Sequence, residues 1–371
     1  MRIRAFINYL QLLLHHKLKQ HRKSSTLFEI DGSQKSGSGT ILRLSVALAA
    51  VTGQPLHICN IRQSRSQPGL KPQHREAVLT AAHLCNAEVQ GTSLGSRELW
   101  FKPHEIKGGK IEAEIGTAGN IPMLLMAILP ICVFAKEEVR LHVTKGGTDT
   151  KNAPTINYVR MVLLSTLGRM GLDTSVIVHK YGYYPKGMGE VTLRVEPCRK
   201  LEPILLERFG NIKSLKGISV CTFLADKRVA ERQANAAKEV LYKNGYSVDM
   251  QVVNDTSNLV QKGSSIMLWA ETDENAVIGA DAIGELGKPS EAVGREAAEK
   301  LCAEISAKPT VDAHLADILI PYMAFAKDYS VFLTRQVTEH LETNIWLVEK
   351  MLGTQFNVSR ENGLWKVERR G

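Results

Sequence analysis

The chain has 371 residues, is 44% hydrophobic and 23% charged, and carries a formal net charge of +9. This length suits two or three domains, and this composition is ordinary for a soluble globular protein. The sequence lacks a run of about 18 uncharged apolar residues, which argues against a membrane span. The six cysteines form no CxxC pair, so we expect free thiols in a reducing compartment, without a zinc site.

The basic charge is concentrated in the first 25 residues. Residues 1–25 contain six Lys or Arg residues and no acidic residue, which leaves only +3 for the rest of the chain. Any RNA-binding charge in the body must therefore be local. The extension is predicted to be disordered, to be a targeting peptide, or to follow from an unused upstream start, and these alternatives stay open. The predicted location of the protein is the cytoplasm.

Repeated units are predicted from residue 27 onward. In the first unit a strand leads through a glycine-rich turn to an apolar helix that stops at Gly53 and Pro55, as glycine and proline commonly end helices. A strand, a helix and two closing strands follow. The six predicted elements span 27–30, 40–51, 56–61, 73–86, 89–90 and 98–102.

The same β-α-β-α-β-β order recurs in the second unit. Its predicted elements span 111–115, 121–134, 139–143, 156–170, 174–179 and 190–195. The end of the chain resembles the unit again, with predicted elements at 311–326, 329–333, 340–352, 355–359 and 364–368. Recurrence of one unit predicts a stacked architecture in which paired helices cover one face of each sheet.

Residues 201–306 break this pattern. Their predicted strands span 218–223, 247–253 and 265–271, and their predicted helices span 229–244 and 290–306. We therefore predict an α/β (α+β) fold with a repeat-built catalytic domain, residues 26–200 and 307–371. A small α/β domain, residues 201–306, is inserted into it.

Two segments of the first unit are candidate anion sites. The turn from Asp31 to Gly39 precedes a helix, so its backbone N–H groups could hold a phosphate, although it lacks P-loop or Rossmann spacing. The loop from Arg62 to Arg75 holds four basic residues and a histidine, and Pro68 and Pro72 would stiffen it, which favours phosphate binding. A plain strand-to-helix turn and a solvated basic loop are the alternatives.

The segment from Tyr181 to Glu190 joins two predicted strands and contains three tyrosines, several glycines and a lysine. Such a loop could stack nucleic-acid bases and lie close to a phosphate backbone. A wide β-turn with packed aromatic rings is the alternative.

Polar residues near the C-terminus supply the candidate nucleophile. His340 begins the last long helix, and a neutral imidazole is a good attacking group at pH 7, although such a residue can also simply occupy a helix end. Asp312, His314 and Asp317 are polar positions in an otherwise apolar helix. We expect these three side chains to face a nucleotide, a metal ion or solvent.

Taken in order, these segments resemble the RNA 3'-terminal phosphate cyclase family over nearly the whole chain from about residue 27. The number and order of the matching motifs make the resemblance specific, although each motif is short. They are Asp31-Gly32 with Ile41-Leu42-Arg43, the Arg62 to His74 loop, Gly116-Thr117-Ala118-Gly119, Gly146-Gly147-Thr148-Asp149, Gly182-Tyr183-Tyr184-Pro185, His314-Leu315-Ala316-Asp317 and His340-Leu341-Glu342-Thr343-Asn344-Ile345.

The resemblance implies a reaction in three steps. His340 attacks the α-phosphate of ATP, which gives an AMP-histidine and pyrophosphate. AMP then passes to the 3'-phosphate of an RNA, and the neighbouring 2'-OH closes a 2',3'-cyclic phosphate with release of AMP. Adenylation is chemically reasonable because it turns a poor leaving group into a good one. A divalent cation, Mg²⁺ or Mn²⁺, is expected to shield the triphosphate, but its ligands are not predicted.

The resemblance also implies roles for particular residues. The catalytic residue is His340. The expected nucleotide-binding residues are Arg43, Met126, His314, Leu315, Ala316, Asp317 and Ile318. The residues expected to bind the RNA phosphate are Arg62, Arg65, Gln73 and His74.

Some positions depart from the family pattern. Ser36 and Ser38 stand where glutamate and glycine are usual, Met126 and Ile318 stand where glutamine is common, and Met188 interrupts a run of glycines. These changes predict a weaker metal site and fewer polar contacts to the nucleotide.

Two other functions fit the same residues. One is a non-enzymatic RNA-binding or ribosome-assembly factor on the same fold, which Ser36 and Met126 favour and His340 and Arg43 disfavour. The other is an enolpyruvyl transferase, a class that is built from similar repeats and binds anionic small molecules through arginine and lysine clusters.

Overall fold

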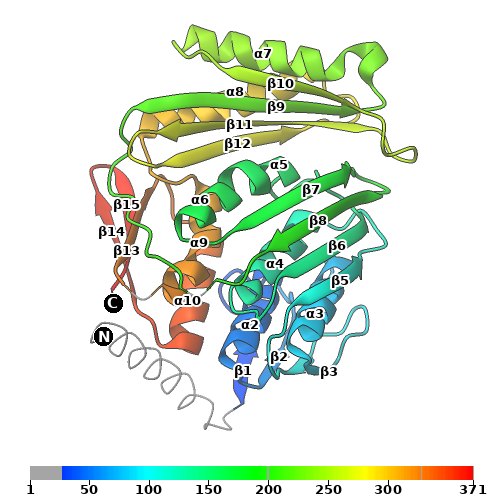
Figure 1. Ribbon diagram of the computed structural model, residues 1–371, viewed down its shortest axis with the longest axis vertical. Helices are drawn as coiled ribbons and strands as arrows, with labels where there is room; N and C mark the ends of the chain where they lie inside the picture. Colours follow the sequence, from blue (N-terminus) through cyan, green and yellow to red (C-terminus); the bar gives the residue numbers. More distant parts are fainter. Residues whose placement is uncertain (1–26, 199, 327, 371) are drawn as a thin grey trace, which may run out of the picture.

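The computed structural model describes residues 27–198, 200–326 and 328–370 (Figure 1). The basic extension predicted at residues 1–25 lies outside the described residues. Within the described part of the chain, no helix combines the length and the apolar character needed to cross a membrane.

The first repeat unit forms a four-stranded sheet in the order β1-β2-β4-β3. Strands β1 and β2 are parallel, and the other pairs are antiparallel. The elements of this unit are β1 (Phe28–Asp31), α2 (Gly39–Thr52), β2 (Leu56–Cys59), α3 (Pro72–Cys85), β3 (Glu88–Gln90) and β4 (Leu99–Lys102).

The second unit repeats this topology, with the order β5-β6-β8-β7 and a parallel pair β5 and β6. Its elements are β5 (Gly109–Glu114), α4 (Ile121–Cys132), β6 (Val139–Gly146), α5 (Ile156–Tyr158), α6 (Leu164–Arg169), β7 (Thr174–Lys180) and β8 (Gly189–Val195). A π-helical turn, Val159–Leu163, joins α5 to α6. The helix predicted at 156–170 is therefore present, but the π-helical turn within it was not predicted.

The third unit has the sheet order β13-β15-β14. Its elements are α9 (Ala313–Phe325), β13 (Ser330–Thr334), α10 (Glu339–Leu352), β14 (Phe356–Glu361) and β15 (Leu364–Arg369). Leu205 adds an isolated parallel bridge to Val331, and Leu206 N donates to Val331 O at 2.9 Å. This short segment occupies the place of the first strand of the third unit. It lies within residues 201–306, so the start of the segment predicted as inserted pairs with the third unit.

Between these two parts of the third unit lies a separate sheet in the order β10-β9-β11-β12, which Figure 1 shows above the repeats. Its elements are β9 (Ile212–Thr222), α7 (Val229–Lys243), β10 (Asp249–Asp255), β11 (Gly263–Thr272), β12 (Val277–Ile283) and α8 (Ser290–Ala307). The domain bounds at 201 and 306 stay a prediction.

Strand β12 was not predicted, because Gly279 weakens the strand signal. The glycine has a packing reason, since a Cβ atom there would lie only 2.7 Å from Val162 of the π-helical turn. Its small size lets the inserted sheet approach the second unit closely.

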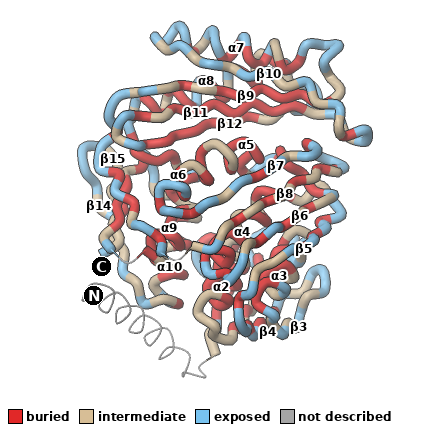
Figure 2. Tube along the Cα trace, in the orientation of Figure 1, coloured by how far each residue is buried: buried red, intermediate tan, exposed pale blue. Residues whose placement is uncertain are grey.

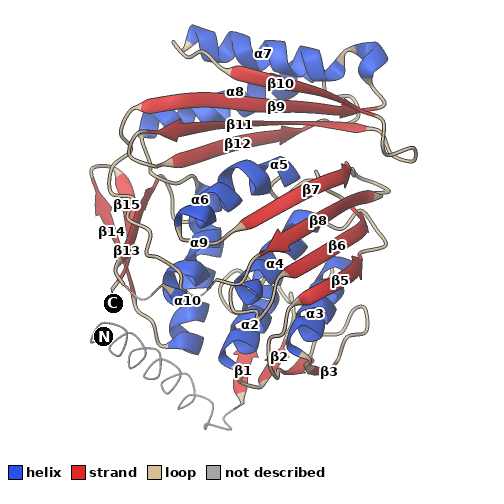
Figure 3. Ribbon diagram, in the orientation of Figure 1, coloured by secondary structure: helices blue, strands red, loops and turns tan. Residues whose placement is uncertain are grey.

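The buried helices lie at the centre of the repeats (Figures 2 and 3). Helix α2 contacts α3, α4 and α10, and α9 contacts α4 and α10. One hydrophobic core includes buried residues of all three units, and a second core lies between the inserted sheet and its two helices. The packing of α2 against α10 brings together two helix N-termini that are about 300 residues apart in the chain.

Candidate active site

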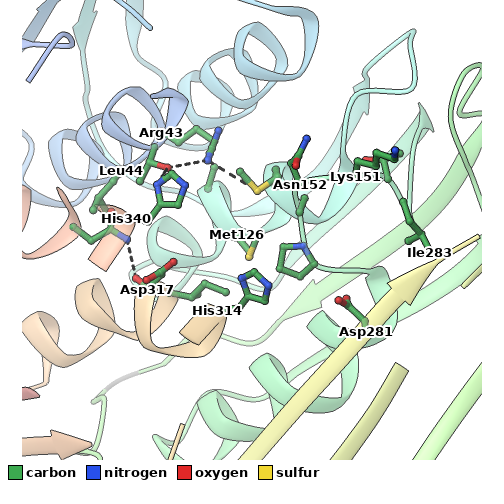
Figure 4. A pocket seen from close by; sticks show the side chains of 18 of the residues that line it. Arg43, Leu44, Met126, Lys151, Asn152, Asp281, Ile283, His314, Asp317 and His340 are labelled. Atoms are coloured by element: carbon green, nitrogen blue, oxygen red, sulfur yellow. Dashed lines mark hydrogen bonds between the residues drawn. The ribbon is translucent and has the colours of Figure 1, made fainter. Parts of the chain in front are cut away.

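A cavity of about 530 Å³ lies where the central helices face the edge of the inserted sheet. Figure 4 shows side chains from several elements pointing into it. Six of the predicted site residues line it: Arg43, Met126, His314, Asp317, Ile318 and His340. Its size is within the range of small-molecule sites, so it can hold a nucleotide.

His340 lies in the first turn of α10, two positions after the N-cap Thr338. The Thr338 hydroxyl accepts a hydrogen bond from Leu341 N at 2.9 Å, which starts the helix at this point. His340 Nδ1 lies 3.2 Å from Oγ1 of Thr40, in the first turn of α2. Because this contact occupies Nδ1, Nε2 is the nitrogen that we expect to act on a ligand.

The surroundings of His340 favour a neutral ring and an anionic ligand. Burial lowers the pKa of His340 below its ordinary value of 6.5, and the positive charges of Arg43 and Arg65 lower it further. The N-termini of α2 and α10 add partial positive charge at the same place. An uncharged nucleophile therefore faces a region that attracts phosphate.

Asp317 connects α9 to the start of α10. Its Oδ1 accepts a hydrogen bond from Thr338 Oγ1 at 2.5 Å, and its backbone carbonyl accepts one from Asn344 Nδ2 at 2.7 Å. Burial raises the pKa of its carboxyl group to about 7, although the bond from Thr338 opposes this shift. Asp317 thus fixes α9 against the start of α10 and so helps to orient His340.

Arg43 lies one helical turn after Thr40 and donates to its hydroxyl at 3.4 Å. Burial, and next the charge of Arg62, lower the pKa of Arg43 to about 10, so it remains a cation at neutral pH. A Cβ atom at Gly39 would lie 2.2 Å from His74 Nε2 and 2.9 Å from Arg43 Nη1. Only glycine at this position leaves room for both side chains beside the start of α2.

The four residues predicted to bind RNA phosphate do not line the cavity. Arg62 is buried, and its Nη1 donates to the carbonyls of Gln67 at 2.8 Å and Gly69 at 2.7 Å, so it shapes its own loop. Gln73 Oε1 accepts from Asn120 N at 2.7 Å, which ties α3 to the second unit.

His74 and Arg65 complete this group. His74 is buried, and its Nδ1 has no hydrogen-bond partner among the described residues. Burial, and next the charges of Arg43 and Arg62, hold the pKa of His74 well below its ordinary value, so it is neutral. Arg65 is exposed and its charge acts on His340, which makes it the member of the set best placed to meet a ligand from solvent.

Two predicted nucleotide-binding residues, Leu315 and Ala316, are fully buried in the core. Their side chains do not line the cavity. Sequence reasoning also missed cavity residues. Asn344 lies four positions after His340, hence on the same face of α10, and this spacing could have identified it. No sequence signal pointed to Asp281 of the inserted sheet.

The structure bears on the expected metal site in two ways. Among residues 27–198, 200–326 and 328–370, no group of three or more His, Cys, Asp or Glu side chains is arranged to hold a metal ion. At the position where an acid was expected, the Ser36 hydroxyl lies 2.9 Å from that of Ser38. A Mg²⁺ or Mn²⁺ ion carried by the triphosphate stays a prediction.

Comparison with known proteins identifies similar chains. The family model described as RNA 3'-terminal phosphate cyclase matches residues 34–358. The protein named RNA 3'-terminal phosphate cyclase from Pyrobaculum neutrophilum is 43% identical over 342 residues, which cover 92% of this chain and 98% of that protein. Proteins of the same name from Pyrococcus furiosus and Methanosarcina acetivorans are 44% and 42% identical, over 89% and 92% of this chain and 94% and 99% of their own lengths.

Proposed function

The chain belongs to the RNA 3'-terminal phosphate cyclase family, and on this premise we propose that it converts an RNA 3'-phosphate into a 2',3'-cyclic phosphodiester through a histidinyl-AMP. Family membership makes it a ligase of RNA processing that uses ATP. The observation that carries the finer proposal is the position of His340 between two helix N-termini, beside Arg43, in a cavity of nucleotide size.

In the first step, Nε2 of neutral His340 attacks the α-phosphorus of ATP. A P–N bond forms, the bond from the α-phosphorus to the bridging oxygen breaks, and pyrophosphate leaves with the electron pair. The ring proton passes to solvent. Arg43 offsets the negative charge that gathers on the phosphoryl oxygens, an effect that only a preorganised cation supplies at low cost.

The base of the nucleotide fits the apolar wall of the cavity. This wall contains Met123, Met126 and Pro130 of α4 and Ile318 of α9. Because Met126 and Ile318 offer no amide groups, we expect the base to be held by packing rather than by hydrogen bonds from these two positions.

In the second step, an oxygen of the RNA 3'-phosphate attacks the phosphorus of the AMP-histidine and frees His340. In the third step, the 2'-OH attacks the activated phosphate, loses its proton and expels AMP, which closes the cyclic ester. Arg65 is the exposed cation that we expect to meet the incoming phosphate, while Arg62 holds its loop in place.

The test of this function uses an RNA with a radiolabelled 3'-phosphate. With ATP and a divalent cation, the label should become resistant to phosphatase, and AMP and pyrophosphate should form in amounts equal to the cyclised ends. Label that stays sensitive to phosphatase while the protein is folded would contradict the proposal.

The pH dependence of adenylation follows from the lowered pKa of His340. A lowered pKa means that the ring gains its proton only at acidic pH, so activity should be constant near neutral pH and fall as pH decreases. We expect single-turnover labelling with α-labelled ATP to give an apparent pKa below 6.5. An acid limb centred above pH 7 would contradict this environment for the ring.

Replacing Arg62 and replacing Arg65 with alanine should have different effects on stability. Arg65→Ala should raise the KM for RNA about tenfold or more and leave the free energy of unfolding unchanged, because Arg65 is exposed. Arg62→Ala should also destabilise the protein by roughly 1–3 kcal/mol, because it leaves the buried carbonyl of Gly69 and the partly buried carbonyl of Gln67 without this donor. Steady-state kinetics and urea unfolding measure both effects, and equal stability losses would refute the distinction.

The two alternatives considered from the sequence are less well supported. Family membership sets aside the enolpyruvyl transferase, and the similar proteins carry the name of the enzyme rather than of an assembly factor. The cytoplasmic location stays a prediction.

A further inference from the structure

The loop between β7 and β8 contains three tyrosines with different environments. Tyr181 and Tyr183 are 9% and 4% exposed, whereas Tyr184 is 77% exposed. The Tyr183 hydroxyl lies 3.2 Å from Thr222 Oγ1, and Gly263 packs against its ring, since a Cβ there would lie 2.1 Å from Tyr183 Cγ. Two of the tyrosines therefore hold the loop, and the third projects from it.

The loop between β10 and β11 lies beside it, and Figure 1 shows both loops at the right-hand edge of the molecule. Its Leu259 and Val260 are 84% and 50% exposed. With Tyr184, these residues place three large exposed side chains on two adjoining loops, here called the cluster. Large apolar side chains that gather on a surface commonly mark a binding site.

Asn258 holds the two loops together. It is buried, and its Nδ2 donates to the carbonyls of Tyr181 at 2.8 Å and Gly187 at 3.0 Å. Its Oδ1 accepts from the backbone N–H groups of Val260 and Gln261, each at 3.1 Å. The exposed side chains are thus presented by two loops of fixed relative position, which lowers the entropy cost of binding.

Positive charge flanks the cluster. Lys186 and Lys262 are exposed, and neither forms an ion pair with any residue that the structure describes. Lysines that are not neutralised, near an aromatic side chain that is 77% exposed, suit a ligand with both phosphates and flat bases. They suit an apolar protein surface less well, because its approach would desolvate both ammonium groups.

The cluster is also connected to the active-site cavity. Tyr183 forms a parallel bridge with Asp149, and Gly182 O accepts hydrogen bonds from Thr148 N at 2.8 Å and Asp149 N at 3.0 Å. The next residue, Thr150, already lines the cavity. An RNA strand whose 3' end lies in the cavity and that is longer than about three nucleotides could therefore extend to the cluster.

We propose that Tyr184, Leu259, Val260, Lys186 and Lys262 form a platform for the single-stranded RNA that precedes the reacting 3' end. The ring of Tyr184 stacks on a base, the two aliphatic side chains pack against its neighbours, and the two lysines bind phosphates. The proposal rests on the proposed function, because it assumes that RNA is the substrate.

The test compares Tyr184→Ala with the matched control Tyr242→Ala. Tyr242 is 80% exposed at the C-terminal end of α7. Since β10 runs parallel to β9 and α7 connects them, this end lies opposite the β10–β11 loop. Binding of a fluorescent single-stranded RNA of about twelve nucleotides should weaken about tenfold in Tyr184→Ala and not in the control. Binding of a trinucleotide 3'-phosphate should not change.

Lys186→Ala combined with Lys262→Ala gives an independent readout. For the longer RNA, the slope of log K against log salt should become shallower by about 1.4, since each lysine contributes about 0.7 on a single strand. Self-adenylation with labelled ATP requires no RNA and shows that each variant is folded.

The outcomes separate this proposal from the proposed function. If the wild-type protein forms no AMP adduct and cyclises no RNA, the proposed function fails. If it does both, and Tyr184→Ala and the double lysine variant still bind the longer RNA as tightly as the control, the platform is refuted. A change from dimer to monomer in Tyr184→Ala with unchanged RNA binding would likewise refute it, and would assign the surface to contact between copies.

Discussion

His340→Asn should abolish the covalent AMP adduct, with a loss of at least about 10³-fold in the adenylation rate. Asparagine is close to histidine in shape but has no basic nitrogen that can attack phosphorus. The amide can still reach Thr40, so the start of α10 should keep its structure. Quench-flow labelling with α-labelled ATP measures the effect.

Two histidines serve as controls for this variant. His83 is exposed in the last turn of α3, away from the cavity, so His83→Asn should adenylate like the wild type. His314 lines the cavity, so His314→Asn should weaken ATP binding but still form the adduct. Normal adduct formation in His340→Asn would show that another residue is the nucleophile.

Arg43→Met should lower the adenylation rate by about 10²- to 10³-fold, because it removes a half-buried cation beside the nucleophile. Methionine keeps the length and apolar part of the side chain. Arg43→Lys should recover only part of the rate, since an ammonium cannot reproduce the planar fork of the guanidinium.

A second readout tests the electrostatic role of Arg43. The charge of Arg43 helps to lower the pKa of His340, so its removal should shift the acid limb of the adenylation profile to higher pH. A purely structural loss would leave the limb in place. Arg295→Met is the matched control, because Arg295 is exposed on α8 and lies near Glu239. An unchanged rate and an unchanged limb in Arg43→Met would contradict the assignment.

The repeated unit was predictable from the sequence because its strands and helices have clear hydrophobic periods and glycine or proline at their ends. The apolar helix after the glycine turn is an example, since Ser38 caps its start and Gly53 ends it with φ 71°. The first strand of the third unit was not predictable. Leu205 is 59% exposed and pairs with a strand more than 100 residues away, so neither its pattern nor its neighbours in sequence identify it.

The candidate site was predictable where residues within one motif share a helix face, as His314 and Asp317 do. It was less predictable where tertiary packing decides the role of a residue. Arg62 was predicted to bind phosphate, but its guanidinium donates hydrogen bonds to two carbonyls of its own loop. The inserted sheet contributes Asp281 and Ile283 to the cavity, and only the packing of β12 against the second unit places them there.

The most direct test of this account is to map the AMP-modified residue in the wild-type protein. After incubation with ATP and a divalent cation, tandem mass spectrometry under alkaline conditions, which preserve a phosphoramidate, should place AMP on the imidazole of His340, and acid should remove it. AMP on a different residue, or no AMP on a folded protein that still cyclises RNA, would contradict the account.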